Sequence, residues 1–262
     1  MTKPNPSQAQ ESEPVESQVR IHFARATVTT SQLTTMTTPT HWLPPIDGLH
    51  RRDPEHRYWL GELEFPISVT GVIGCLKSDF AMQRIMATRS TWEPRGNNCH
   101  RALELMLGTT RGSPWNIEQM RHGIAELGAL AVGDHSTWIQ PLLEHDRWHQ
   151  LQVIASERPT CCIRRKVAGT YDAAYIDEDG RRILADLKSL GENGATYSTA
   201  AQLGGYMALE ATHGHHYDAG QTIWCRPGST TFSPLYSRSE CLLAWAGAWA
   251  TYKARNTEPP PF

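Results

Sequence analysis

The sequence has no strong excess of either charge, no long apolar run and no regular cysteine spacing. Its 25 lysines and arginines face 27 aspartates and glutamates, so the net charge of -2 provides no global positive field for a polyanion. The longest apolar run, from Cys241 to Ala250, is much shorter than the roughly 20 residues that cross a bilayer. The polar N-terminus also lacks the features of a secretion signal. We therefore expect a cytoplasmic protein with no membrane partner.

The six cysteines include an adjacent pair and no CxxC motif. This spacing is a poor match to a zinc ribbon or a disulfide framework, so we interpret the cysteines as reduced thiols.

The composition is that of a globular protein, with 39% apolar residues and 9 tryptophans. Residues 1–40 are rich in Ser, Thr, Gln and Pro and contain no Trp or Tyr, which predicts a disordered tail. The remaining residues, 41–262, are predicted to form one domain. Its first part, about 41–155, is interpreted as a helical arm, and its second part, about 156–262, as the core.

Several elements can be predicted from periodicity and turn residues. In the arm, Asn97 or Asn98 is expected to cap a helix over Cys99–Leu107, and helices are predicted for Asn116–Leu130 and Trp138–Ile154. In the core we expect two strands, Ile163–Ile176 and Arg182–Leu190, then a helix, a strand and a helix. The first of these helices is expected to be capped by Ser198 or Thr199 and to run to about residue 212, and the last strand and helix are predicted at 222–225 and 239–253. This order indicates a mixed α/β, or α+β, fold.

The two predicted strands form a β-hairpin whose register can be derived. If Gly180 takes the left-handed position of a three-residue loop, Asp177 pairs with Arg181. Counting back along both strands places Asp172 opposite Asp186, and Lys188 shares that face.

Two facing carboxylates destabilise a sheet unless a cation lies between them, and open carboxylate oxygens suit a hard divalent ion. With a lysine beside it, such an ion could support phosphodiester hydrolysis. The ordinary alternative is a hairpin with scattered surface charges, because one DxK triplet is common.

The helix after the hairpin carries a second signal. Gln202 and Tyr206 share one face, four residues apart, and the glycines at 204 and 205 between them are poor helix formers. We expect the backbone to approach a sheet or a nucleic-acid strand there. Upstream, His100 lies one turn before Glu104 and could be a metal ligand, although a core histidine is the ordinary interpretation.

Taken in order, these segments resemble a known family. GNNCH (Gly96–His100), GTYD (Gly169–Asp172), DLK (Asp186–Lys188) and QLGGY (Gln202–Tyr206) resemble the four motifs of the RecB-type branch of the PD-(D/E)xK nuclease superfamily. The segment SVTGVIG, residues 68–74, resembles more loosely the compact exonucleases akin to the mitochondrial genome maintenance exonuclease and its phage and bacterial relatives.

The resemblance implies a restriction-endonuclease-like core, a mixed central sheet flanked by helices, with Mg²⁺ or Mn²⁺ as cofactor. The implied metal ligands are His100, Asp172, Asp186 and the Leu187 carbonyl, together with Glu157, because relatives often carry an acid just before the hairpin. Lys188 would be the catalytic lysine beside Asp172 and Asp186, oriented by Gln202 and Tyr206.

Some RecB-like nucleases hold an iron–sulfur cluster with one cysteine before the core and three after it. Only Cys225 and Cys241 follow the core here, so we expect no cluster.

Nucleic-acid contacts are expected at two places. Arg164, Arg165 and Lys166 precede the GxxD strand and could follow a phosphate backbone, although a charge run is commonly only a solvated face. The resemblance also implies contacts from Ser68 and Thr70.

A competing motif places His145 and His149 four residues apart, as in a HExxH zinc protease, with histidines at 213, 215 and 216 as possible third ligands. Asp146 replaces the catalytic glutamate, which favours a solvated helix face.

We therefore expect a Mg²⁺- or Mn²⁺-dependent DNA exonuclease of repair, recombination or replication, acting on DNA with a free end that could be single-stranded. The alternative is a catalytically inactive nucleic-acid-binding or assembly protein on the same fold. The sequence gives no indication of the oligomeric state.

Overall fold

The structure, a computed structural model, describes residues 41–52, 56–109 and 112–256. The predicted tail, residues 1–40, lies outside the described residues. Every described residue belongs to one unit of the chain, Thr37–Phe262.

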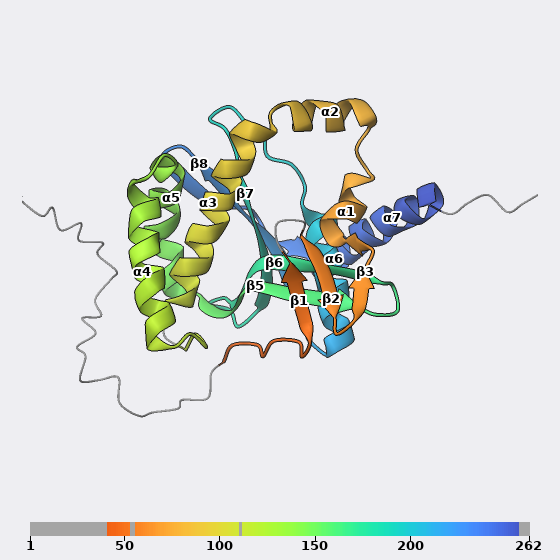
Figure 1. Ribbon diagram of the computed structural model, residues 1–262, viewed down its shortest axis with the longest axis horizontal. Coiled ribbons are helices and arrows are strands. Elements are labelled where there is room, and N and C mark those ends of the chain that lie inside the picture. The colour runs from red at the N-terminus through yellow and green to blue at the C-terminus, as the bar shows by residue number, and fades with distance from the viewer. Residues whose placement is uncertain (1–40, 53–55, 110–111, 257–262) are drawn as a thin grey trace, which may run out of the picture. The chain divides into compact units, whose positions relative to one another are not determined.

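A mixed sheet of seven strands forms the centre of this unit (Figure 1). The path β10-β8-β7-β6-β4 is joined by β5, which pairs with β6, and by β9, which pairs with β8. β6 and β7 are antiparallel, whereas β7 and β8 are parallel. The predicted mixed α/β fold is confirmed. The strands are β4 (Ile67–Ser68), β5 (Gln152–Cys162), β6 (Val167–Ile176), β7 (Arg182–Ser189), β8 (Ala219–Arg226), β9 (Ser229–Phe232) and β10 (Tyr236–Ser237).

Helices cover both faces of this sheet (Figure 1). On one face Ile183, Ala185 and Leu187 of β7 pack in a core with α3 (Arg89–Gly108), α4 (Ile117–Val132) and α5 (Ser136–Leu143). On the other face Leu184 packs in a second core with α1 (Val69–Gly74), α6 (Ala200–Glu210) and α7 (Arg238–Asn256). The alternation of neighbouring β7 side chains between the two cores follows from the two-residue period of a strand. α2 (Asp79–Ala87) connects α1 to α3 and has no buried residue.

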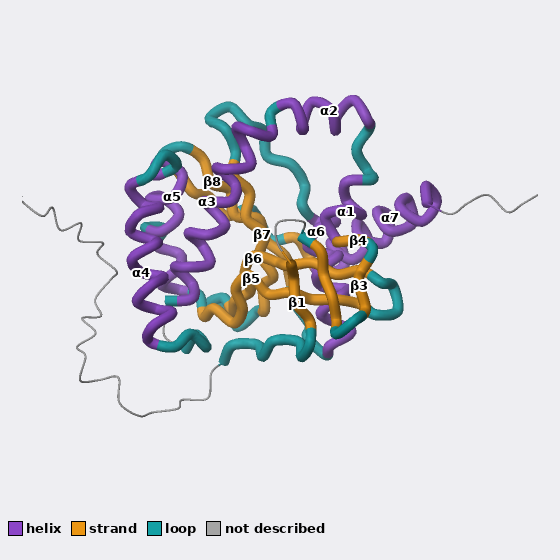
Figure 2. Tube along the Cα trace, in the orientation of Figure 1, coloured by secondary structure: helices purple, strands orange, loops and turns teal. Residues whose placement is uncertain are grey.

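A small antiparallel sheet contradicts the predicted helical arm from residue 41. It contains β1 (Leu49–Arg52), β2 (Arg57–Leu60) and β3 (Leu63–Phe65), shown as strands in Figure 2. Tyr58 and Phe65 pack in a third core with Cys161 and Ala168 of the central sheet. Within the predicted arm, the helices are therefore confined to the segment between β4 and β5.

The predicted hairpin register is confirmed. The Asp177 N–H donates to the Arg181 carbonyl at 3.0 Å, and Gly180 takes a φ of +78°. The pairing then runs to Ala173 opposite Ala185.

Of the first two helix starts predicted in the arm, one is wrong and one is confirmed. α3 begins at Arg89 after Thr88, so the expected cap at Asn97 or Asn98 is wrong and both residues lie inside the helix. Packing of the face that carries Cys99 and Leu103 outweighs the weak helix propensity of this segment. The helix from Asn116 is confirmed, with Asn116 and Gln119 forming a capping box.

The predicted helix over Trp138–Ile154 is wrong. α5 ends at Leu143, a 3₁₀ helix follows over Asp146–Gln150, and β5 begins at Gln152. The last predicted core helix, 239–253, is confirmed as α7, in which the ring centroids of Trp245 and Trp249 lie 6.0 Å apart.

Among the described residues, no helix combines the length and apolar character needed to cross a membrane.

Candidate metal centre

Asp172 lies one residue beyond the last backbone pair between β6 and β7. The last pair of the antiparallel register is Ala173 with Ala185, and one further step places Asp172 opposite Asp186, as predicted. Here the Asp172 side chain bonds to the neighbouring strand, because its Oδ2 accepts a hydrogen bond from the Leu187 N–H. Asp172 is thereby held against β7 and is buried.

Glu157 lies opposite Asp172 on the other side. The pairs on either side of Glu157 are Ser156 with Ala173 and Arg158 with Tyr171, so the register of β5 and β6 places Glu157 across from Asp172. Its φ of +43° is in the left-handed region, which costs a non-glycine residue about 1–2 kcal/mol. Surrounding pairs on both sides hold this conformation in place.

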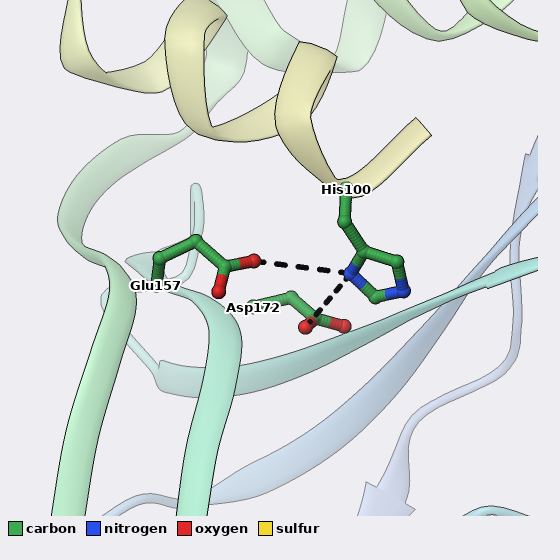
Figure 3. A group of neighbouring side chains, drawn as sticks. All are labelled: His100, Glu157 and Asp172. Atoms are coloured by element: carbon green, nitrogen blue, oxygen red, sulfur yellow. Dashed lines mark ion pairs between the residues drawn. The ribbon is translucent and has the colours of Figure 1, made fainter. Parts of the chain in front are cut away.

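His100 completes the group from α3. Its Nδ1 lies 3.0 Å from Asp172 Oδ1 and 3.8 Å from Glu157 Oε1, and Figure 3 shows the ring nitrogen facing both carboxylates. Within the described chain, these three residues form a group whose ligand atoms all lie within 4.8 Å of one another. Two carboxylates and one imidazole form a donor set that suits Mn²⁺, and the carboxylates also suit Mg²⁺. The residues therefore fit the expected cofactor.

The charges of this group are strongly coupled. Burial acts to lower the pKa of His100, but Asp172 and Glu157 outweigh it and hold the pKa well above its ordinary value. Burial raises the pKa of Glu157. For Asp172, burial acts in the same direction but is outweighed by His100 and Lys188, so its pKa is lowered. A protonated imidazole thus neutralises part of the negative charge where a metal ion would bind.

Asp186 lies in a second cluster with Lys188 and Gln202. Lys188 Nζ is 2.6 Å from Asp186 Oδ2, and Gln202 Nε2 donates to Asp186 Oδ1 at 2.6 Å. The same nitrogen lies 3.4 Å from the hydroxyl of Tyr206. Burial raises the pKa of Asp186 to about 6 although Lys188 opposes it. Burial acts to lower the pKa of Lys188, but Asp186 and Asp172 raise it overall, so the lysine remains charged.

Both clusters open into one cavity of about 290 Å³. Asp172 lies between the two groups, because His100 contacts its Oδ1 while the charge of Lys188 acts on it from the β7 side. The residues predicted for the site that line this cavity are Ser68, Thr70, His100, Glu157, Asp172, Asp186, Lys188, Gln202 and Tyr206.

The Leu187 carbonyl and the basic turn at residues 164–166 were also predicted for the site, and the structure does not test their roles. The Leu187 N–H is engaged by Asp172, and the role of the Leu187 carbonyl as a ligand stays a prediction. Arg164, Arg165 and Lys166 lie in the exposed turn between β5 and β6 and are not among the residues that line the cavity. Arg165 instead stacks over Trp249 of α7, at 5.5 Å. Contact of this turn with DNA stays a prediction.

Sequence reasoning missed the part of the cavity wall that comes from the small sheet. Arg51, His56 and Tyr58 line the cavity, and the Tyr58 hydroxyl donates to Thr170 Oγ1 at 3.1 Å. The basic residues Arg51 and Arg52 are a visible signal in the sequence, but the helical arm predicted from residue 41 left no strand to carry them to the site.

The glycines of α6 allow a close helix contact. A Cβ at Gly204 would lie 1.9 Å from the Cys241 carbonyl oxygen of α7, and one at Gly205 would lie 2.7 Å from Val69 Cγ1 of α1. The expectation of a close approach was right, but its partners are helices rather than a sheet or a nucleic-acid strand. This packing fixes α6 and so places Gln202 and Tyr206 in the cavity.

The competing zinc motif is not assembled. His145 precedes the 3₁₀ helix, its Nδ1 accepts a hydrogen bond from the Arg147 N–H at 3.2 Å, and its ring packs on Phe232 at 4.9 Å. His213 Nε2 lies 2.7 Å from the Cys161 carbonyl oxygen, on another part of the fold. His145 and His149, the pair of the motif, therefore do not share the face of an α-helix.

Comparisons with known proteins add little to this geometry. No known family and no curated protein matches the sequence. Among solved structures, one described as the crystal structure of SSO0001 matches with a TM-score of 0.31 and 14% sequence identity. That match covers 62% of this chain and 75% of the other.

Proposed function

We propose that this protein is a Mg²⁺- or Mn²⁺-dependent deoxyribonuclease of the RecB-type PD-(D/E)xK superfamily. The observation that carries the proposal is the convergence of residues from all four motifs on one cavity. His100, Asp172 and Lys188 come from α3, β6 and β7, and Gln202 comes from α6. A chance set of charged residues would have no reason to be gathered from four elements into one concave site.

His100, Glu157 and Asp172 would hold the metal ion. When bound, the ion would lower the pKa of a water molecule and polarise a phosphoryl oxygen. The group needs little rearrangement, since its ligand atoms already lie within 4.8 Å of one another. The His100 proton must leave before Nδ1 can act as a ligand.

Lys188 has the role of an electrostatic catalyst. Its ammonium group is charged, lines the cavity and is held 2.6 Å from Asp186. A fixed positive charge at this place stabilises the negative charge that develops on a phosphate during hydrolysis. Gln202 and Tyr206 are positioning residues, because Gln202 holds the Asp186 carboxylate that in turn holds the lysine.

The substrate class follows from the motif resemblance, and the cavity is compatible with it. Lys188 and the small-sheet residue Arg51 both line the cavity that holds the candidate metal ligands, so two cationic side chains are available there to a phosphate chain. The segment at residues 68–74 resembles compact exonucleases, although loosely. It therefore favours exonuclease activity, in DNA repair, recombination or replication.

The test is incubation of the full chain with end-labelled linear DNA and closed circular DNA, each single- and double-stranded, with Mg²⁺, with Mn²⁺ or with EDTA. We expect degradation of linear DNA only, and only with a divalent ion. Cleavage of closed circles would show an endonuclease instead. Tight binding of DNA without cleavage under any of these conditions would favour the inactive binding protein and contradict the proposal.

A further inference from the structure

A second cavity, of about 470 Å³, lies beside the candidate site on the β8 side. It is formed by the segment before α6 and by β8, β9 and the residues that follow β9. The lining residues are Thr196, Tyr197, Ser198, Trp224, Thr231, Phe232, Ser233, Pro234 and Tyr236. Its volume lies within the range of small-ligand pockets, about 300–1,000 Å³.

The chemistry of this cavity differs from that of the metal centre. Among the described residues, none in its lining carries a formal charge, so none of them would neutralise a phosphate. Aromatic rings and hydroxyl groups dominate instead. Tyr197 is 53% exposed, and its ring is held by Trp224 in an edge-to-face contact with the centroids 5.2 Å apart. Hydroxyl groups can donate or accept hydrogen bonds, so they suit the polar edge of any base.

The cavity is connected to the site through the sheet. Trp224 of β8 pairs with Lys188 of β7, so the two side chains lie on the same face of the sheet, on neighbouring strands whose backbones are about 4.8 Å apart. Burial raises the pKa of the Tyr197 hydroxyl and the charge of Lys188 opposes this shift, so Tyr197 is also within electrostatic reach of the lysine. A group bound at Tyr197 therefore lies next to whatever is held at Lys188.

We propose that Tyr197 and Trp224 form a nucleobase pocket, in which Tyr197 stacks on an unpaired base of the nucleotide next to the scissile phosphate. This inference rests on the proposed function, because the phosphate of that nucleotide is placed at Lys188. The neutral, aromatic lining takes the uncharged base, while Lys188 and the metal centre take the charged phosphate. Stacking on an aromatic ring is tolerant of base identity and contributes about 1–3 kcal/mol per base.

The pocket has a consequence for the form of the substrate. A base inside a duplex has both faces covered by its neighbours and its edge paired, so it cannot enter the cavity beside Tyr197. The strand in the site must be unpaired at that nucleotide. Because the lining offers hydroxyl groups from Thr196, Ser198 and Thr231 rather than a fixed donor and acceptor pattern, we expect little preference among the four bases.

The test measures binding of a short fluorescent single-stranded oligonucleotide to the full chain in EDTA, so that no cleavage is needed. Tyr197→Ala should weaken binding by roughly tenfold or more, as expected from the loss of one stacked base. Tyr197→Phe keeps the ring and should restore binding to near the parental value. Phe80→Ala, which removes another exposed aromatic ring on α2, is the matched control and should have no effect.

A series of oligonucleotides that each lack one base locates the stacked position. At that position the missing base should weaken binding to the parental protein but not to Tyr197→Ala. The pocket would be overturned if the parent and Tyr197→Ala bound the complete oligonucleotide equally well. It would also be overturned if every missing base weakened the binding of both proteins by the same factor. A parental protein that does not bind the oligonucleotide at all would also overturn it. Because cleavage is scored separately with metal, failure of the nuclease proposal remains distinguishable from failure of the pocket.

Discussion

Glu157 lies across from Asp172 on neighbouring strands, with a backbone conformation that residues other than glycine avoid. The carboxylate faces His100 at 3.8 Å, and the residue holds a φ of +43° between two regularly paired neighbours. Strained backbone of this kind is a common feature of functional sites. In this protein the strained residue is the third member of the candidate metal centre.

Replacing Glu157 with glycine should therefore separate stability from metal binding. We expect Glu157→Gly to raise the unfolding temperature of the metal-free protein, because it relieves about 1–2 kcal/mol of backbone strain and removes a half-buried acid. It should also weaken Mn²⁺ binding. Lys166→Gly is the matched control, since Lys166 also has a positive φ, +53°, but lies in the exposed β5–β6 turn. The control should gain stability and keep its affinity for Mn²⁺. A Glu157→Gly variant that binds Mn²⁺ like the parent would contradict the assignment of Glu157 as a ligand.

The candidate metal centre should bind Mn²⁺ more tightly as the pH rises. In the metal-free protein the pKa of His100 is well above its ordinary value, so the imidazole must lose a proton before it can bind the ion. Calorimetric titration at several pH values should show increasing affinity and proton release. We expect His100→Ala to weaken binding by roughly tenfold or more. His122→Ala, on an exposed part of α4, should bind like the parent. An affinity that does not change with pH would count against a protonated His100.

Asp186 should make the metal-free protein less stable as the pH rises. Its pKa is about 6 in the folded protein, above the ordinary value of 3.8, so the folded state binds the proton more tightly than the unfolded state. The resulting stabilisation is complete below about pH 4 and is lost as the pH rises through 6. Unfolding temperatures in EDTA should show that Asp186→Asn gains stability relative to the parent between pH 4 and pH 7. The exposed Asp134→Asn is the control and should follow the parental curve. If the unfolding temperature of Asp186→Asn changed with pH in the same way as that of the parent, the raised pKa of Asp186 would be refuted.

The contact between α6 and α7 should not tolerate a larger residue at Gly204. Gly204→Ala places a Cβ against the backbone of Cys241, which cannot move without shifting α7, and overpacking of this kind costs about 1–3 kcal/mol. Gly247→Ala is the matched control, because a Cβ there has no atom of the described residues within 4 Å and lies on an exposed part of a helix. It should stabilise the protein by up to about 1 kcal/mol. Chemical denaturation of both variants measures the difference, and equal effects would show that the close contact is absent.

The hairpin could be predicted because its information is local. Gly180 identifies the turn, the turn fixes Asp177 against Arg181, and the two-residue period of the strands carries the register to Asp172 and Asp186. The shared face of Gln202 and Tyr206 follows from helix geometry in the same way. For these residues no knowledge of the tertiary structure was needed.

The position of Glu157 could not be predicted from local signals. The segment before it was interpreted as a helix, and the turn that joins β5 to β6 contains no glycine, proline or asparagine to identify it. Lys166 instead takes the left-handed conformation of that turn. The small sheet was missed for a related reason, since its contribution of Arg51, His56 and Tyr58 depends on packing against the distant residues Cys161 and Ala168.

The most direct test of the central claim is the cleavage of end-labelled linear DNA by the parent, Asp186→Ala and Lys188→Ala in Mg²⁺ or Mn²⁺. The proposed function predicts that the parent degrades the DNA and that both variants lose activity while circular dichroism shows a folded protein. The loss follows because Lys188 and Asp186 form one ion pair in the cavity, 2.6 Å apart. Digestion by either folded variant at the parental rate would contradict the claim.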